Sequence, residues 1–587
     1  MATADMNEAI SRVAAKKTEW ACLSPARKLE ILDLLLDNLY AHCEELQEAS
    51  IIKRDGETDT APAYDALEPH ELTALQNSSR STHWLHSSML IGNWLVIIRE
   101  YFEAVVKTGA PPKPVAVREM PTEEGKPQRF LVKVGPQGLL HTTLVTYGSM
   151  ELMVEGPVEQ EMLHEKPPGV SAILGAGNFD GPIDLLTSLF IENRVCVYKV
   201  SPYNSLLLDP LNKVFAPLTE NGYAAFIYGG PDEGKALLNH PEVDKWYMTG
   251  SAATAYTILW GSPTPPSSPA EPLLNKDMTV ELGNCTPWII CPGKWSQRQL
   301  KWHASAIAAA MSFNGAHICA HPQVLVTCKN WPQRKEFLQL IQMCINEINY
   351  VGCYYPDFVA RMESTKRQLM ELGRKPEDFE IQVQCPLSKD TDIKCIIFAT
   401  DLPEDCFFTQ QETFSPCCGE VQLDTDGTIE AFLPVAVKYA NEKVHGGLSV
   451  SVSVKPITPK EEQAVEQAIA DLEYGAVHIN TDSKLSIAFP SLIWGGRPGS
   501  NIYNLNSGIG FIGNCFGFKR PVKSVVRAPI LNFTHMILTA PNSSSAKRMA
   551  KLWRRISHAT FQRRSSQSWW SFAGGLTKIA SAFAANL

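Results

Sequence analysis

The chain has 587 residues, of which 44% are hydrophobic and 20% are charged, with a formal net charge of −9. This length allows two or three domains with large buried cores, and the composition is typical of a soluble globular protein rather than a disordered or fibrous one. The 15 cysteines are an odd number with no CxxC pair and no zinc-finger spacing, so we expect reduced thiols in the cytoplasm rather than a disulfide framework.

The charge is unevenly distributed along the chain. Residues 483–587 contain 14 Lys or Arg and no Asp or Glu, which leaves 39 basic and 62 acidic residues before them. This uneven charge distribution indicates a basic C-terminal tail with a function distinct from that of the rest of the chain. Asp5 and Glu8 interrupt the N-terminus, and no run of about twenty apolar residues occurs, so neither a secretory signal nor a spanning helix is predicted.

The first hundred residues show helical patterns. Ser24 and Pro25 form an N-cap followed by proline at the first helical position, and apolar residues then recur at helical spacing through 29–39. Residues 109–165 are proline-rich and contain the strand-like "RFLVKVG", which indicates an insertion or a β-hairpin.

From residue 168 onward, short apolar strands alternate with helices. Strands are expected in 168–179, 195–200, 223–230 and 243–251, with helices in 180–194, 205–222 and 231–240. After a surface loop at 261–272, a helix in 302–315, a strand in 322–328 and a helix near 333–350 continue the pattern. This alternation predicts an α/β fold with parallel sheets, whose ligands bind at the carboxyl ends of the strands.

We expect four segments. They are N-terminal helices with a Rossmann-like domain (1–290), a second α/β domain (291–494), a returning strand or bridging segment (495–534) and a basic, aromatic tail (535–587).

Five short motifs follow one another in a recognisable order. They are "AGNF" (176–179), "YMTGS" (247–251), "MTVELGNCTPWII" (278–290) with "FNGAHICAHPQ" (313–323), "ETFSP" (412–416) and "VHGGLSVSV" (444–452). Each motif is weak alone, but together they resemble the aldehyde dehydrogenase superfamily. The resemblance implies NAD(P)-dependent oxidation of an aldehyde to a carboxylic acid, with a Rossmann-like cofactor domain and a second α/β catalytic domain.

The resemblance assigns three catalytic residues. Cys319 would be the nucleophile, because a thiohemiacetal can expel the hydride that a planar carbonyl holds. Asn178 would donate a side-chain hydrogen bond to the resulting oxyanion, together with the backbone N–H of Cys319. Glu281, inside an apolar run, would activate the water that hydrolyses the thioester.

The resemblance also assigns the cofactor contacts. Lys199 would bind the adenosine ribose, and Gly250 with Ser251 would open a helix toward the pyrophosphate. Glu412 would hold the nicotinamide ribose, with Phe414 packed beside it. Pro202 stands about where many NAD-using members carry a glutamate, so we expect either NAD or NADP to be accepted.

Departures from the family motifs leave alternatives open. The aromatic neighbour of Asn178 is missing, and Asn284 with Cys285 replaces the usual Gly-Lys, so a catalytically silent scaffold remains one hypothesis. A CoA-acylating dehydrogenase is another, although Glu281 argues against it. His317 and His321 flank Cys319 and could form a hydrolase dyad or a metal site, but we expect neither, and no metal is assigned.

The resemblance further implies a homo-oligomer, dimeric or tetrameric, acting on a small-molecule aldehyde. No nucleic-acid partner is expected. The protein should be cytoplasmic, with its tail on the cytosolic face of a membrane if that tail binds lipid.

The tail combines an apolar stripe with basic side chains. Met549, Leu552, Trp553 and Ile556 recur at helical spacing, and five Lys or Arg residues surround them in 547–555. This pattern is typical either of a disordered extension or of a peripheral anchor on an anionic membrane, where each basic residue contributes roughly 1 kcal/mol. Two glycines and a lysine near the end argue against a spanning helix.

Vesicle flotation distinguishes these two interpretations. If the tail is an anchor, the full-length protein will float with anionic vesicles at low salt, and a chain ending near residue 540 will stay in the soluble fraction. Neutral vesicles and moderate salt serve as controls, because screening weakens the electrostatic part of the binding. If the full-length protein also stays soluble on anionic vesicles at low salt, the anchor hypothesis is wrong.

Overall fold

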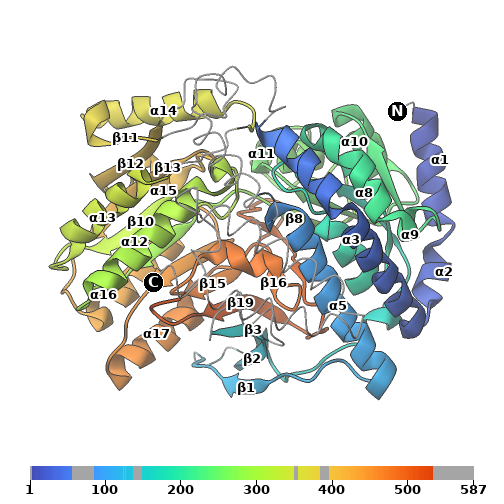
Figure 1. Cartoon of the computed structure of the whole chain (residues 1–587), viewed down its shortest axis with the longest axis horizontal. Coiled ribbons are helices and arrows are strands. Elements are labelled where there is room, and N and C mark those ends of the chain that lie inside the picture. Colours follow the sequence, from blue (N-terminus) through green and yellow to red (C-terminus); the bar gives the residue numbers. More distant parts are fainter. Residues whose placement is uncertain are drawn as a thin grey trace.

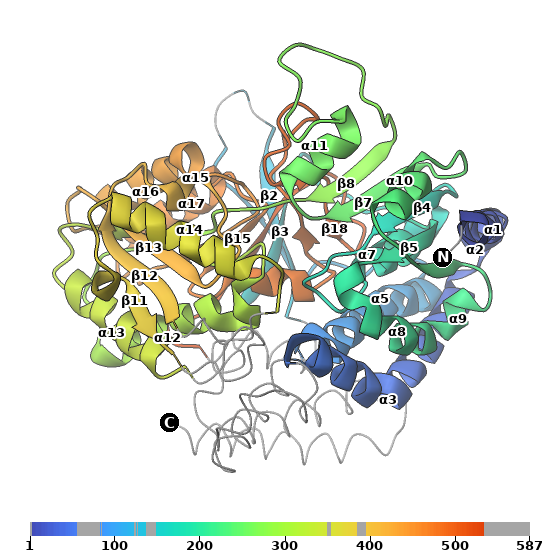
Figure 2. The ribbon, with the colours of Figure 1, turned by 90° about the horizontal axis from the view of Figure 1, so that it is seen from above.

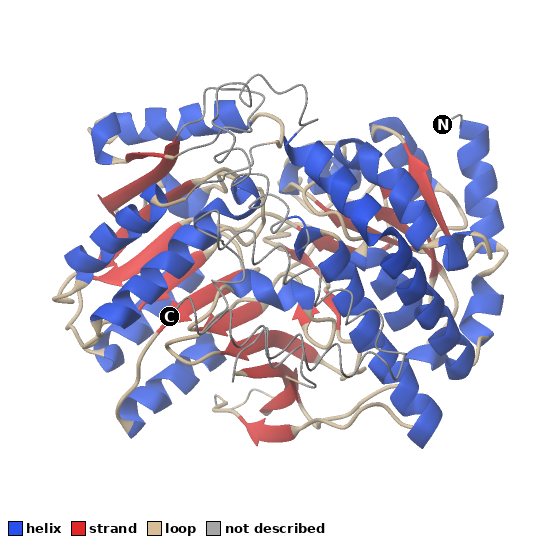
Figure 3. Cartoon of the chain, in the orientation of Figure 1, coloured by secondary structure: helices blue, strands red, loops and turns tan. Residues whose placement is uncertain are grey.

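The structure is a computed structural model of the chain, and it describes residues 3–55, 83, 85–122, 125, 127–136, 148–348, 354–383 and 395–532. Two large sheets form its framework, one of six strands and one of eleven, and helices cover both (Figures 1 and 3). The α/β class predicted from the sequence is confirmed.

The six-stranded sheet is parallel except at one edge. Its order is β17-β8-β7-β4-β5-β6, and only β17 runs antiparallel to its neighbour β8. Its strands are β4 (Val170–Leu174), β5 (Val195–Val200), β6 (Ala224–Tyr228), β7 (Lys245–Thr249), β8 (Asp277–Glu281) and β17 (Gly508–Ile509). β4 occupies the middle of this sheet, so the turn after it opens at the centre of the carboxyl edge, where parallel sheets bind ligands.

Helices cover both faces of this sheet. Figure 2 shows α3, α5 and α8 on one face, with α10 and α11 on the other. The helices of this half are α1 (Thr3–Ala14), α2 (Lys17–Cys22), α3 (Pro25–Asp55), α5 (Ser88–Thr108), α7 (Ile183–Leu186), α8 (Leu208–Val214), α9 (Ala216–Thr219), α10 (Pro231–Asn239) and α11 (Ala252–Trp260). The Ser24 hydroxyl accepts the Arg27 N–H at 3.2 Å, so the predicted helix start at Pro25 is confirmed.

The eleven-stranded sheet is mixed. Its order is β1-β2-β3-β19-β15-β14-β9-β10-β13-β12-β11, parallel in the middle and antiparallel toward both edges. Its strands are β1 (Ala116–Glu119), β2 (Arg129–Gly135), β3 (Ser149–Glu155), β9 (Pro287–Ile290), β10 (Val324–Cys328), β11 (Glu380–Gln382), β12 (Cys395–Leu402), β13 (Cys417–Leu423), β14 (Ser449–Ser453), β15 (Ala476–Ile479) and β19 (Pro521–Arg527). β16 (Ile493–Trp494) and β18 (Ile512–Gly513) form a separate pair. The strand predicted in "RFLVKVG" is β2, which pairs with β1 and β3.

Two helical layers cover the parallel part of this sheet. In Figure 2, β11–β13 lie between α12 and α13 on one face and α16 and α17 on the other. The helices are α12 (Gln297–Ser312), α13 (Arg334–Asn346), α14 (Phe358–Glu371), α15 (Phe407–Gln410), α16 (Ile429–Lys443) and α17 (Pro459–Asp471). The helices predicted in 302–315 and near 333–350 are therefore present as α12 and α13.

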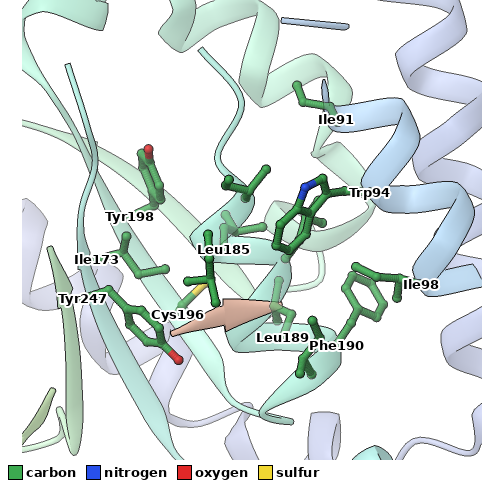
Figure 4. Close-up of a cluster of buried hydrophobic side chains, with 14 of the residues drawn as sticks. Ile91, Trp94, Ile98, Ile173, Leu185, Leu189, Phe190, Cys196, Tyr198 and Tyr247 are labelled. Carbon is green, nitrogen blue, oxygen red and sulfur yellow. The ribbon is translucent and has the colours of Figure 1, made fainter. Parts of the chain in front are cut away.

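Each sheet has its own hydrophobic core. One cluster packs α3, α5 and the helical segment after β4 against the six-stranded sheet, and the other packs α12, α13 and α16 against the larger one. Figure 4 shows Trp94 and Ile98 of α5 facing Leu189 and Phe190, with Ile173 and Tyr247 on the sheet side. Among the described residues, none of the helices is long and apolar enough to span a bilayer. The predicted tail, 535–587, lies outside the described residues, and the division of the chain into four segments stays a prediction.

Candidate active site

Cys319 and Glu281 meet although 38 residues separate them. Glu281 is the last residue of β8 in the six-stranded sheet, and Cys319 lies between α12 and β10 of the other. The Cys319 Sγ donates a hydrogen bond to Glu281 Oε1 at 2.7 Å. Cys319 is only 7% exposed and Glu281 is half-buried, so the thiol meets the carboxyl in a largely desolvated place.

The chain reaches Cys319 through a strained turn. After α12, three consecutive residues adopt positive φ angles, namely 55° at Asn314, 61° at Gly315 and 61° at Ala316. Alanine rarely adopts this region, so surrounding contacts must hold the turn. Asn314 supplies two of them, because its Nδ2 donates to the carbonyls of Asn178 at 3.1 Å and of His317 at 3.2 Å.

Asn178 lies on the turn that follows β4 and is 5% exposed. Its side-chain Nδ2 donates to the His317 carbonyl at 3.0 Å, two residues before the nucleophile. An amide nitrogen carries two N–H groups, so this contact fixes the side chain and leaves a second donor. The turn after β4 and the turn after α12 are therefore joined by hydrogen bonds in both directions.

A buried ionic cluster links the Asn178 turn to α3. Asp180 accepts from Lys53 at 2.8 Å, from Arg54 at 2.6 Å and from the Ser50 hydroxyl at 2.5 Å, all three on α3. Arg54 also donates to the Asn178 carbonyl at 3.2 Å and to Asn314 Oδ1 at 2.9 Å. Burial alone would raise the pKa of Asp180, but the charges of Arg54 and Lys53 outweigh it and lower the pKa.

Sequence reasoning did not find this cluster. Lys53 and Arg54 received no role from the sequence, and Asp180 only opened the helix predicted in 180–194. Their side chains are at most 3% exposed, which no local pattern reveals. The only signal was an acidic residue two positions after Asn178, at the start of an otherwise apolar segment.

The two histidines beside Cys319 form no dyad with it. His317 Nδ1 pairs with the Phe414 carbonyl at 3.0 Å, and His321 Nε2 pairs with the Cys417 carbonyl at 2.9 Å. Burial lowers the pKa of both rings, to about 3 and about 4. They act as neutral structural groups. In the part of the chain that the structure describes, no group of three or more His, Cys, Asp or Glu residues could hold a metal ion.

Solved structures share this arrangement of sheets. A γ-glutamyl-γ-aminobutyraldehyde dehydrogenase from Burkholderia cenocepacia superposes with a TM-score of 0.59 at 16% identity, covering 89% of this chain and 88% of that one. An NADP-dependent glyceraldehyde-3-phosphate dehydrogenase from Bacillus halodurans, complexed with NADP, superposes with a TM-score of 0.57 at 14% identity, covering 89% and 91%.

The chain has the aldehyde dehydrogenase fold. The resemblance inferred from the motifs is thus confirmed at the level of the fold. In sequence, an N-succinylglutamate 5-semialdehyde dehydrogenase from Erwinia tasmaniensis is 28% identical over 141 residues, which span 23% of this chain and 28% of that enzyme. No protein-family model matches the chain.

Electrostatics in this aldehyde dehydrogenase fold keep the thiol protonated at rest. Burial raises the pKa of Cys319 well above its ordinary value, and the charge and hydrogen bond of Glu281 raise it further. Burial also raises the pKa of Glu281, while the hydrogen bond from Cys319 opposes that rise. The thiol proton of Cys319 can therefore pass from Sγ to the Glu281 carboxylate when Sγ forms a bond to a substrate carbon.

Three of the expected cofactor residues lie at the ends of β5 and β7, which are on the same side of the Glu281 strand β8. Lys199 is on β5 and is 8% exposed. Its ammonium forms no hydrogen bond or ion pair with a described residue, although the charge of Glu233 acts on it and raises its pKa against the effect of burial. Ser251 is the N-cap of α11, and its hydroxyl accepts the Thr254 N–H at 3.2 Å. The Gly250 N–H donates to the Glu281 carbonyl at 3.0 Å, so an anion here would meet the first N–H groups of α11 instead.

Glu412 and Phe414 lie across from this edge, beside the larger sheet. Glu412 Oε1 accepts the Asn284 N–H at 3.3 Å, and burial raises the pKa of Glu412 to about 7. A Cβ at Gly283 would come within 2.5 Å of the Glu412 carboxylate, so any larger residue there would displace that carboxylate. Phe414 has a φ of 46° and presents its carbonyl to His317.

Alkylation of Cys319 tests the electrostatic account without any substrate. Peptide mass spectrometry can follow iodoacetamide labelling of Cys319 separately from the other cysteines. Labelling should be slow at neutral pH and rise with pH, because only the thiolate reacts. In Glu281→Gln the negative charge that raises the thiol pKa is gone, so labelling at pH 7–8 should be severalfold faster than in wild type. Glu119→Gln, an exposed residue on β1, is the matched control, and slower labelling in Glu281→Gln would contradict the account.

Proposed function

We propose that this protein oxidises an aldehyde to a carboxylic acid with NAD or NADP, through a thiohemiacetal and a thioester on Cys319. The observation that carries this proposal is the hydrogen bond between Cys319 Sγ and Glu281, in a fold shared with aldehyde dehydrogenases. A buried thiol placed on a carboxyl is the arrangement that activates a cysteine nucleophile.

The first step is attack of sulfur on the aldehyde carbon. As the carbon–sulfur bond forms, Glu281 takes the thiol proton, which offsets the high pKa that burial imposes on Cys319. The carbonyl oxygen becomes an oxyanion, which the remaining N–H of the Asn178 amide and the Cys319 backbone N–H would stabilise. Removing one such donor costs roughly 10²- to 10³-fold in kcat in other enzymes.

A nicotinamide dinucleotide, when bound, supplies the hydride acceptor that turns the thiohemiacetal into a thioester. The residues present fit such a ligand. Lys199 offers a buried ammonium that forms no ion pair with a described residue, the start of α11 offers N–H groups, and Glu412 offers a carboxylate. The Bacillus halodurans structure, complexed with NADP, supports this choice of cofactor.

Thioester hydrolysis returns the enzyme to its starting state. Glu281, once it has released the thiol proton toward solvent, is again a carboxylate and would take a proton from a water molecule as the water oxygen attacks the acyl carbon. The carbon–sulfur bond breaks, the acid leaves, and the Cys319 thiolate takes that proton back from Glu281. This second role of Glu281 supports water over CoA as the acyl acceptor.

The remaining sequence-based expectations are part of the same proposal. The substrate is a small-molecule aldehyde, the protein is cytoplasmic and forms a homo-oligomer, and its basic tail is a candidate anchor on an anionic membrane surface. The catalytically silent scaffold is the competing hypothesis, and a purified protein that produces no NAD(P)H from any aldehyde would favour it.

Two substitutions separate the steps of the mechanism. Cys319→Ala should lose essentially all dehydrogenase activity while still binding the dinucleotide, because the thiol contacts substrate rather than cofactor. Glu281→Gln should release one equivalent of NAD(P)H rapidly and then turn over at least about 10²-fold more slowly, because the base that hydrolyses the thioester is missing. Stopped-flow absorbance measures both, and full turnover by Cys319→Ala would overturn the mechanism.

Cofactor choice depends on the residues after β5. Pro202 begins a short 3₁₀ helix directly after Ser201, three residues beyond Lys199. No carboxylate stands at this position to repel a 2′-phosphate, so NADP should bind at least as tightly as NAD.

A carboxylate introduced at position 202 tests whether the absence of charge there permits NADP binding. Pro202→Glu should weaken NADP binding selectively by like-charge repulsion, and Pro202→Gln is the uncharged control. Fluorescence titration with both dinucleotides measures the effect. A wild-type protein that binds NAD far more tightly than NADP would show that the prediction is wrong.

A further inference from the structure

Asp184 is a buried carboxyl that the mechanism above does not use. It lies on the short helix α7, next to Leu185 of the core shown in Figure 4, and is only 9% exposed. Its side chain forms no ion pair and accepts no hydrogen bond from any residue that the structure describes. An unpaired acid in the interior is costly and calls for a functional explanation.

Asp184 and Glu281 line the same small cavity. The cavity also contacts Thr279 and Trp494, and it leaves about 10 Å³ for the centre of a water molecule. This is close to the room that one ordered water requires. Polar groups on its wall make it a site for water rather than a dry void.

Trp494 brings an indole N–H to the wall of the same cavity. Its Nε1 is buried and forms no well-aligned hydrogen bond with a described residue, but it lies close enough to Glu281 to act as a weak donor, which lowers the pKa of that carboxyl. A water between Glu281 and Asp184 would connect the two acids and give the indole N–H a better-placed acceptor.

The carboxyl groups of Asp184 and Glu281 also interact electrostatically. Burial raises the pKa of Asp184 to about 7, and the charge of Glu281 contributes to that rise. The other titratable groups coupled to Asp184 are Tyr198 on β5 and Tyr247 on β7, whose pKa values burial raises well above their ordinary range. Neither phenol is charged near neutrality, so Asp184 and Glu281 are the pair that exchanges protons there.

We propose that Asp184 is the proton-relay partner of Glu281, linked to it through one water in this cavity. After Glu281 takes the thiol proton of Cys319, it donates that proton to the bridging water. The water passes one of its own protons to the Asp184 carboxylate. Glu281 is then again a carboxylate that can act as base toward the hydrolytic water, and Asp184 is a carboxylic acid that releases its proton to solvent before the next turnover. No bond to carbon changes in this relay. Asp184 touches no substrate and acts only through Glu281.

A spectroscopic titration tests the coupling without catalysis. Protein labelled with ¹³C-aspartate allows infrared spectroscopy to separate Asp184 from Glu412, which titrates in the same range. Wild type should show an aspartic acid that loses its proton near pH 7, and Asp184→Asn should lack it. In Glu281→Gln the same transition should move to lower pH, because the charge that raises the Asp184 pKa is gone. An unmoved transition would overturn the proposal even if the enzyme is active.

Kinetics test the relay itself, and this part rests on the proposed function. Asp184→Asn should keep its KM and its initial burst of NAD(P)H but lower steady-state kcat roughly tenfold, since general acid–base help is worth about 10²- to 10⁴-fold in total. The alkaline limb of kcat against pH and the solvent isotope effect should change as well. Asp277→Asn, an exposed carboxyl on the same strand as Glu281, is the matched control.

The outcomes separate the two claims. A wild-type protein without turnover contradicts the proposed function and leaves the infrared result to decide the coupling. Wild-type turnover with an Asp184→Asn variant identical in kcat, pH profile and isotope effect overturns the relay alone. Loss of kcat in Asp184→Asn with an unchanged pH profile and isotope effect would show a structural role and also overturn it.

Discussion

The contact between Cys319 and Glu281 joins the two halves of the molecule. Glu281 ends a strand of the six-stranded sheet, and Cys319 follows the helix that packs on the eleven-stranded sheet. A 2.7 Å hydrogen bond between them requires both sheets to hold their carboxyl edges in register. The strained turn at 314–316 and the fixed amide of Asn178 serve this one geometry, because a small displacement would separate sulfur from oxygen.

Burial decides the chemistry of that contact. In water a thiol and a carboxyl would titrate independently. Here burial raises the pKa of both Cys319 and Glu281, so a proton that leaves one group is most readily accepted by the other. The Asp180 cluster shows how the fold tolerates charge beside this site. Its acid is paired with Lys53 and Arg54 and fully hydrogen-bonded, whereas Asp184 is buried without a partner. Asp180 and Asp184 are four residues apart, but the paired Asp180 has a structural role and the unpaired Asp184 a proposed functional one.

Much of the fold followed from local patterns. The Ser24–Pro25 helix start and the alternation of strands and helices after residue 168 depend on periodicity and capping, which the sequence displays directly. The candidate catalytic residues came from ordered motifs, because Cys319, Glu281 and Asn178 carry no signal strong enough alone. Lys53, Arg54, Asp180 and Asp184 could not be found in this way. Their roles depend on which side chains become buried together, and that is a property of the tertiary structure rather than of neighbouring residues.

The most direct test of the central claim is the mass of the Cys319 peptide after Glu281→Gln protein is mixed with an aldehyde and NADP. If Cys319 is the nucleophile and Glu281 the hydrolytic base, the acyl thioester should accumulate on Cys319 in this variant and clear rapidly in wild type. A Cys319 peptide that stays unmodified while NADPH is formed at the wild-type rate would contradict the account.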